Sequence, residues 1–86
     1  MKTIYKYELE LAAVQEVEMP ACPNFLDVQI QGDKICVWAQ VDTEVISEAQ
    51  RFFIVGTGKE IPPNENLNYI GTVQQGAFVW HVWVQR

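Results

Sequence analysis

The segment Gly56-Thr57-Gly58-Lys59 carries the residue types that bind anions. Glycine adopts positive φ angles readily, and successive unobstructed N–H groups form a concave nest for an anion. Thr57 adds a hydroxyl group and Lys59 adds a positive charge. The glycine–lysine spacing of a phosphate-binding P-loop is missing. The segment therefore predicts a small anion site or, in a simpler interpretation, a glycine turn that ends a strand.

A second cation, Arg51, lies at the other end of the same expected strand, Arg51–Val55. At the rise of a β-strand, Arg51 and Lys59 are roughly 20 Å or more apart, so one subunit does not bring both to one ligand. A second copy of the chain could supply the missing cation. Arg51 is therefore included among the candidate ligand-binding residues.

Aromatic side chains are numerous for a chain of 86 residues, and they include Trp38, Trp80 and Trp83. Trp80 and Trp83 point to opposite faces of one strand, because side chains alternate along it. At least one tryptophan is therefore expected at the surface, where it could stack with His81 on a nucleobase or contact another subunit. His81 has a simpler interpretation as a half-buried ring that is hydrogen bonded within the protein. Trp38, His81 and Trp83 complete the candidate ligand-binding set.

The sequence offers little for catalysis or metal binding. His81 is the one histidine, and Cys22 and Cys36 do not form a CxxC pair, so the three or four ligands of a zinc site are not indicated. His81 could act as a base, but no residue is marked as its nucleophile. We therefore expect no catalytic residue, no metal, no cofactor and no enzymatic activity. Cys36 is expected as a buried thiol and Cys22 as a free thiol in a loop.

Alternation of apolar and polar residues predicts that β-strands position these candidates. Turn residues separate seven short segments of this kind, a spacing typical of a sandwich or a small barrel. The fold class is therefore all-β, a small antiparallel sandwich or barrel of six or seven strands in a single domain, residues 1–86, with at most one short helical turn near 44–50. The expected strands are Tyr5–Leu11, Val17–Met19, Leu26–Gln31, Ile35–Asp42, Arg51–Val55, Leu67–Val73 and Ala77–Val84.

Two features of the last strands bear on assembly. Gly71 interrupts a strand and predicts a bulge or a close approach of another backbone. The final strand is apolar on both faces, and at a sheet edge it would need to be covered. We therefore expect a homo-oligomer with residues Ala77–Gln85 at or near the interface.

Composition and charge exclude several classes of function. The chain has six Lys and Arg residues and eleven Asp and Glu residues, which gives a net charge of −5. This charge argues against general nucleic-acid binding and against binding to an anionic membrane surface. No run of ~20 apolar residues could span a membrane as a helix. Residues Met1–Lys6 lack the apolar core of a secretion signal, so we expect a cytoplasmic protein. A small anionic ligand remains possible, because a local group of cations can hold it.

Several short segments together resemble a family of short proteins encoded by phages and by bacterial genomes that carry prophages. The resemblance covers nearly the whole chain, although its end, Trp83–Arg86, departs from the pattern. It implies a phage or prophage origin and a role during infection, which would place the protein in the host cell cytoplasm, but no particular chemistry. The matching segments are Ile4-Tyr5-Lys6-Tyr7, Met19-Pro20, Leu26-Asp27-Val28-Gln29, Ile35-Cys36-Val37-Trp38-Ala39, Arg51-Phe52-Phe53-Ile54, Gly56-Thr57-Gly58, Tyr69-Ile70-Gly71-Thr72 and Val79-Trp80-His81-Val82.

Three functions are compatible with these observations. The first is a phage-encoded anti-defence protein that binds and sequesters a nucleotide-derived immune signal of the host. The second is an acidic interaction protein that inhibits a host defence or regulatory protein by direct contact. The third, a nucleotide hydrolase, has the poorest support from the residues present. The first is favoured by the resemblance to phage proteins together with the glycine segment and the aromatic residues.

Overall fold

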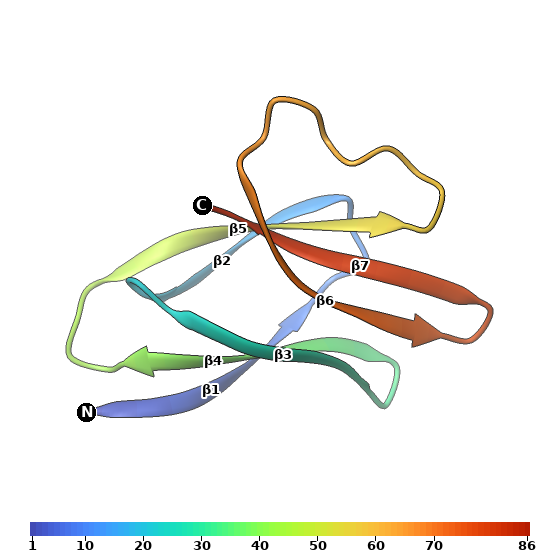
Figure 1. Ribbon diagram of the computed structural model, residues 1–86. Helices are drawn as coiled ribbons and strands as arrows, with labels where there is room; N and C mark the ends of the chain where they lie inside the picture. Colours follow the sequence, from blue (N-terminus) through green and yellow to red (C-terminus); the bar gives the residue numbers. More distant parts are fainter.

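The chain is made of seven β-strands, and no segment is helical (Figure 1). The computed structural model describes all residues from Met1 to Arg86. The structure accordingly has no helix that is long and apolar enough to span a membrane. The strands are β1 (Lys2–Leu9), β2 (Val14–Pro20), β3 (Asn24–Gln31), β4 (Lys34–Asp42), β5 (Ser47–Gly56), β6 (Leu67–Gln75) and β7 (Phe78–Gln85).

The strands form two antiparallel sheets that pack as a small sandwich, as the alternation predicted. One sheet has three strands in the order β1-β4-β3, and the other has four in the order β2-β5-β7-β6. Inward-facing residues from both sheets make one shared core, because alternate residues of each strand point to the same face. The core consists of Leu9, Met19, Val28, Ile35, Val37, Phe52, Ile54, Val73, Val82 and Val84.

Gly71 marks the place where β6 of the larger sheet comes closest to β3 of the smaller sheet. A Cβ atom built on Gly71 would lie 2.6 Å from Cγ1 of Val28. The pairing of β6 with β7 is also irregular here, between Tyr69 and Gly71. The predicted bulge at Gly71 is therefore confirmed, whereas the close approach is made by the Val28 side chain and not by another backbone.

The sequence allowed at most one short helical turn near 44–50, and the structure has none there. Residues 43–46 form a turn and β5 already begins at Ser47. Residues Ser47–Gln50 pair with Val17–Pro20 of β2, and the C=O group of Ile46 accepts a hydrogen bond of 2.9 Å from the N–H group of Ala21. Pairing with β2 thus satisfies backbone groups of a segment too short to be stable as an isolated helix.

The final strand, β7, is not an edge strand. It lies between β5 and β6, and both of its backbone edges are hydrogen bonded. An unpaired edge therefore gives no reason for β7 to seek a partner subunit. Any subunit contact of this strand would have to use its exposed side chains rather than its backbone.

Candidate functional site

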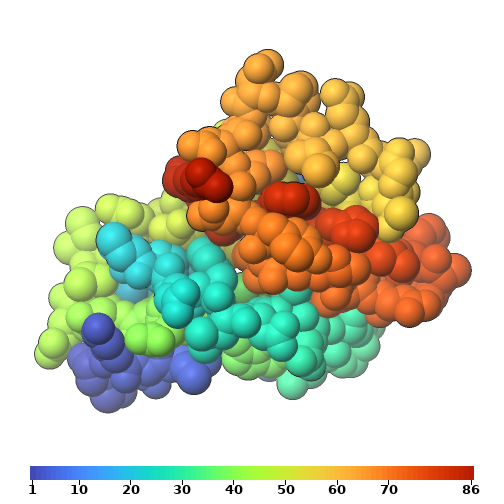
Figure 2. All heavy atoms as spheres, in the orientation of Figure 1, coloured from blue at the N-terminus to red at the C-terminus, as the bar shows by residue number.

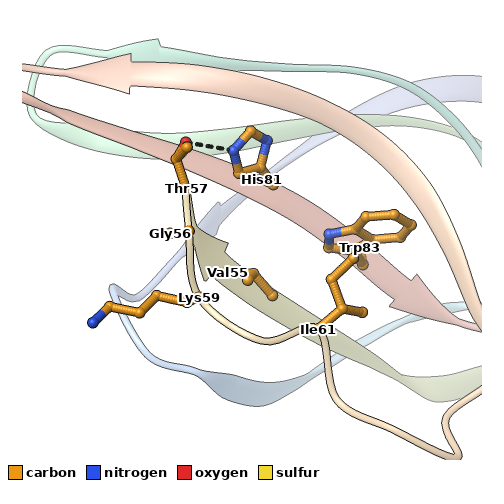
Figure 3. Close-up of a pocket in the computed structure, with 8 residues that line it drawn as sticks. Val55, Gly56, Thr57, Lys59, Ile61, His81 and Trp83 are labelled. Carbon is orange, nitrogen blue, oxygen red and sulfur yellow. Dashed lines mark hydrogen bonds between the residues drawn. The ribbon is translucent and has the colours of Figure 1, made fainter.

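A pocket of about 250 Å³ lies where β5 ends and the loop 57–66 begins, on the outer face of the four-stranded sheet. Figure 2 shows this loop, in yellow to orange, projecting from the body of the molecule. Six of the eight candidate residues line the pocket together with Val55 and Ile61; these six are Gly56, Thr57, Gly58, Lys59, His81 and Trp83. The glycine segment and the aromatic residues of β7, which are distant in sequence, thus meet in one site (Figure 3).

Strand register explains why these residues meet. Val55 of β5 lies opposite His81 of β7, and Phe53 lies opposite Trp83. Since directly paired residues share a face, His81 and Trp83 both stand on the outer side of the sheet. Beyond Gly56 the chain turns back through Gly58, which has a φ of +85°, a conformation that glycine adopts without steric cost.

His81 is held by two threonines on either side. Its Nε2 atom lies 2.7 Å from Oγ1 of Thr57, and its Nδ1 atom lies 2.9 Å from Oγ1 of Thr72. Thr72 is in turn hydrogen bonded to the hydroxyl group of Tyr69. The simpler interpretation of His81, a half-buried ring bonded within the protein, is confirmed, and the same ring also forms part of the pocket wall.

The glycine segment does not form a nest of several free N–H groups. The N–H group of Thr57 donates to the C=O group of Val79 at 3.3 Å, and that of Lys59 donates to the C=O group of Gly56 at 3.0 Å. Only the N–H group of Gly58 has no acceptor among these three residues. The turn interpretation therefore accounts for most of the segment, and one backbone donor remains for a ligand.

Trp83 lines the pocket and carries a second N–H group without a partner. Its indole Nε1 is buried and has no hydrogen-bond partner, whereas the indole Nε1 of Trp80 donates to Oε1 of Gln75 at 3.0 Å. Figure 3 shows the nitrogen of Trp83 on the side of the ring that faces His81 and Val55. A buried donor without an acceptor costs about 1–3 kcal/mol.

Two candidate residues lie elsewhere. The Arg51 guanidinium is 5.4 Å from the centre of the Phe53 ring and borders a different hollow with Glu16. Trp38 is on β4 in the other sheet, where it lies opposite Lys6 and Asp27. One chain therefore does not bring Arg51 to Lys59, as the rise of the strand predicted, and Trp38 lies away from the pocket because it belongs to the other sheet.

Sequence reasoning missed four residues of the site. Val55 and Ile61 supply apolar lining, and Thr72 and Tyr69 support His81. Only the pairing of β6 with β7 identifies Thr72 as the partner of His81, and the irregularity between Tyr69 and Gly71 shifts that pairing. No pattern in the sequence predicts this register of β6 against β7.

The electrostatics of the pocket depend on Lys59, the one cation that lines it. The two groups with displaced pKa values lie outside the pocket. Burial, with the nearby Tyr5, raises the pKa of Tyr7. A hydrogen bond from the Glu44 N–H group, with the nearby N-terminal ammonium, lowers the pKa of Asp42. No group of three or more His, Cys, Asp or Glu residues is placed to hold a metal ion.

The fold and the site define a small antiparallel β-sandwich with a mainly apolar pocket lined by Gly58, Lys59 and Trp83. The chain belongs to the family described as a domain of unknown function, DUF7352, whose family model matches residues 1–86. Comparison with curated proteins and with solved structures gives no significant match.

Proposed function

We propose that the protein is a binding module that captures a small anionic ligand of the nucleotide type and releases it unchanged. The observation that carries the proposal is that Gly58, Lys59 and Trp83 line one pocket. Together with the resemblance to phage proteins, this supports a role as an anti-defence protein that sequesters a nucleotide-derived immune signal in the host cytoplasm. A homo-oligomer remains part of the proposal, since a second copy could enclose the ligand further.

The chemistry of the pocket suits one ring with a charged substituent. Its walls are mainly apolar, from Val55, Ile61 and Trp83, and its polar groups are few, as in most small-molecule sites. Its volume of about 250 Å³ is slightly below the roughly 300–1,000 Å³ of such sites. A phosphate near Lys59 and a ring acceptor near the Trp83 N–H group would use the available donors.

The surroundings of His81 favour a protein that binds its ligand over one that catalyses a reaction. Both ring nitrogens of His81 are engaged by threonine hydroxyls, and Thr72 is in turn bonded to the Tyr69 hydroxyl group. A triad needs a nucleophile, a base and a group that orients the base. The hydroxyl–imidazole–hydroxyl arrangement instead supports a structural role for the ring in the pocket wall.

A capture-and-release assay tests this proposal. The protein is incubated with a mixture of the four 5′-ribonucleoside monophosphates, filtered, and then denatured by heat. The proposal predicts depletion of one or more nucleotides from the filtrate and their recovery, chemically intact, after heating. An altered product would indicate an enzyme, and absence of depletion would contradict nucleotide capture.

One further observation favours the alternative, an acidic protein that binds a host protein directly. The edge strand β2 exposes Glu16 and Glu18, and the chain carries a net charge of −5. An acidic edge attracts a basic surface, and salt weakens such attraction. A pull-down from host lysate would recover a basic partner whose binding falls as salt rises, and Glu16→Gln with Glu18→Gln would reduce the recovery.

A further inference from the structure

A second hollow lies on the other side of the turn that ends β5. It has a volume of about 370 Å³ and shares Gly56, Thr57 and Lys59 with the pocket described above. Its remaining lining is Ala77, Phe78, Val79 and Trp80. The two hollows therefore flank one short segment, and Lys59 borders both of them.

Aromatic rings form the wall of this second hollow. Phe78 and Trp80 are stacked, with their ring centres 5.5 Å apart and their planes 13° from parallel. Phe78 is 63% exposed, which is unusual for a phenylalanine packed on a neighbouring ring and leaves ring surface open to a ligand. The indole N–H group of Trp80 is already bonded to Gln75, so the hollow offers stacking surface rather than a free indole donor.

Gly56, which lines both hollows, has no side chain to separate them. A Cβ atom on Gly56 would lie 3.3 Å from Cζ3 of Trp80 and 3.6 Å from Cγ of Lys59. The absence of a side chain at Gly56 thus lets Trp80 and the stem of Lys59 approach the same backbone. Along β7, Trp80 faces one side of the sheet, and His81 and Trp83 face the other, so each hollow receives its own aromatic residue.

Two ring-binding surfaces with one cation between them match a ligand of two rings joined through phosphate. We propose that the natural ligand is a dinucleotide: one base enters the pocket at Trp83, the other stacks on Phe78, and the linking phosphate lies at Lys59. This inference rests on the proposed function and adds the class of ligand. Base stacking on aromatic side chains is strong enough for the second ring to increase affinity measurably.

Calorimetric titration with two probes, AMP and the linear diadenylate pApA, tests the inference. We expect pApA to bind about tenfold or more tightly than AMP, at one molecule per chain. Phe78→Ala should remove most of this gain and leave AMP binding unchanged. Tyr5→Ala, which also removes an exposed aromatic ring, is the matched control, because Tyr5 is on β1 in the other sheet.

The outcomes separate the two proposals. If pApA binds no more tightly than AMP, or if Phe78→Ala leaves the affinity for pApA unchanged, the dinucleotide inference is overturned while the proposed function stands. A ratio of one pApA per two chains, without an effect of Phe78→Ala, also overturns it, because each chain would then bind one ring. If neither probe binds, both proposals are contradicted.

Discussion

Oγ1 of Thr57 lies 2.7 Å from Nε2 of His81, so a side-chain hydrogen bond ties the turn after β5 to the neighbouring strand β7. The N–H group of Thr57 makes a second link to the C=O group of Val79 on the same strand. These two bonds fix the turn against the floor of the pocket. They make the turn part of the rigid sandwich rather than a free loop.

Removal of the Thr57 hydroxyl should therefore weaken the fold. Thr57→Val keeps the shape of the side chain and removes the bond to His81, and we expect a loss of about 0.5–1.5 kcal/mol in the free energy of unfolding. Urea denaturation measures this loss. Thr3→Val is the control, because Thr3 makes no side-chain hydrogen bond in the structure; an equal loss in both variants would contradict a specific role for the Thr57–His81 bond.

Ligand capture should depend on Lys59 and not on Arg51. The Lys59→Ala variant is expected to weaken AMP binding about fivefold, corresponding to roughly 1 kcal/mol for an exposed charge near a phosphate. Arg51 borders a different hollow, so Arg51→Ala should leave AMP binding unchanged if one chain forms the whole site. Isothermal titration measures both affinities.

The same pair of variants tests the expected homo-oligomer. If Arg51→Ala weakens AMP binding as much as Lys59→Ala does, a second copy of the chain must bring Arg51 to the pocket. Light scattering on the wild-type protein would then show a dimer or a larger species. If the protein is a monomer and Arg51→Ala still weakens AMP binding, neither a site formed by one chain nor a site shared between two copies would explain the result.

Much of this fold could be predicted from local sequence, because alternation and turn residues act over a few positions. Gly71 is the clearest case: a glycine inside an apolar strand indicated a bulge or a close approach of another backbone, and the structure has the bulge, with the Val28 side chain close by. The helical turn that the sequence allowed near 44–50 is absent, since pairing of Ser47–Gln50 with β2 is a contact between distant segments. Local propensity carries no information on such pairing.

The site was partly predictable for the same reason. The glycines, Thr57 and Lys59 are adjacent in sequence, so their chemistry could be identified together. His81 and Trp83 were chosen by residue type, and their position beside the turn required the pairing of β5 with β7. Thr72, the second partner of His81, depends on the irregular register of β6 and was missed.

The contact of β6 with β3 should not tolerate a side chain at position 71. In Gly71→Ala the new Cβ atom would lie 2.6 Å from Cγ1 of Val28, and a β-branched valine cannot turn away easily. We expect a destabilisation of about 1–3 kcal/mol from this overpacking, measured by urea denaturation. In a Val28→Ala background the same substitution should cost much less. A similar cost in both backgrounds would show that the clash with Val28 is not the cause.

Asp42 should give the protein a stability that is lost in acid. The N–H group of Glu44 donates to Oδ1 of Asp42 at 3.0 Å and the Met1 ammonium lies 3.6 Å away, and both lower the pKa of this carboxyl group in the folded state from its ordinary value of 3.8. Because the unfolded chain binds the proton more readily, the contribution is complete above about pH 5 and is lost as the pH falls through the folded pKa. The difference in unfolding free energy between wild type and Asp42→Ala should therefore be constant near neutrality and shrink in acid. Asp42→Asn keeps the acceptor for Glu44 and should lose less than the alanine variant. A difference between wild type and Asp42→Ala that grows as the pH falls would contradict this account.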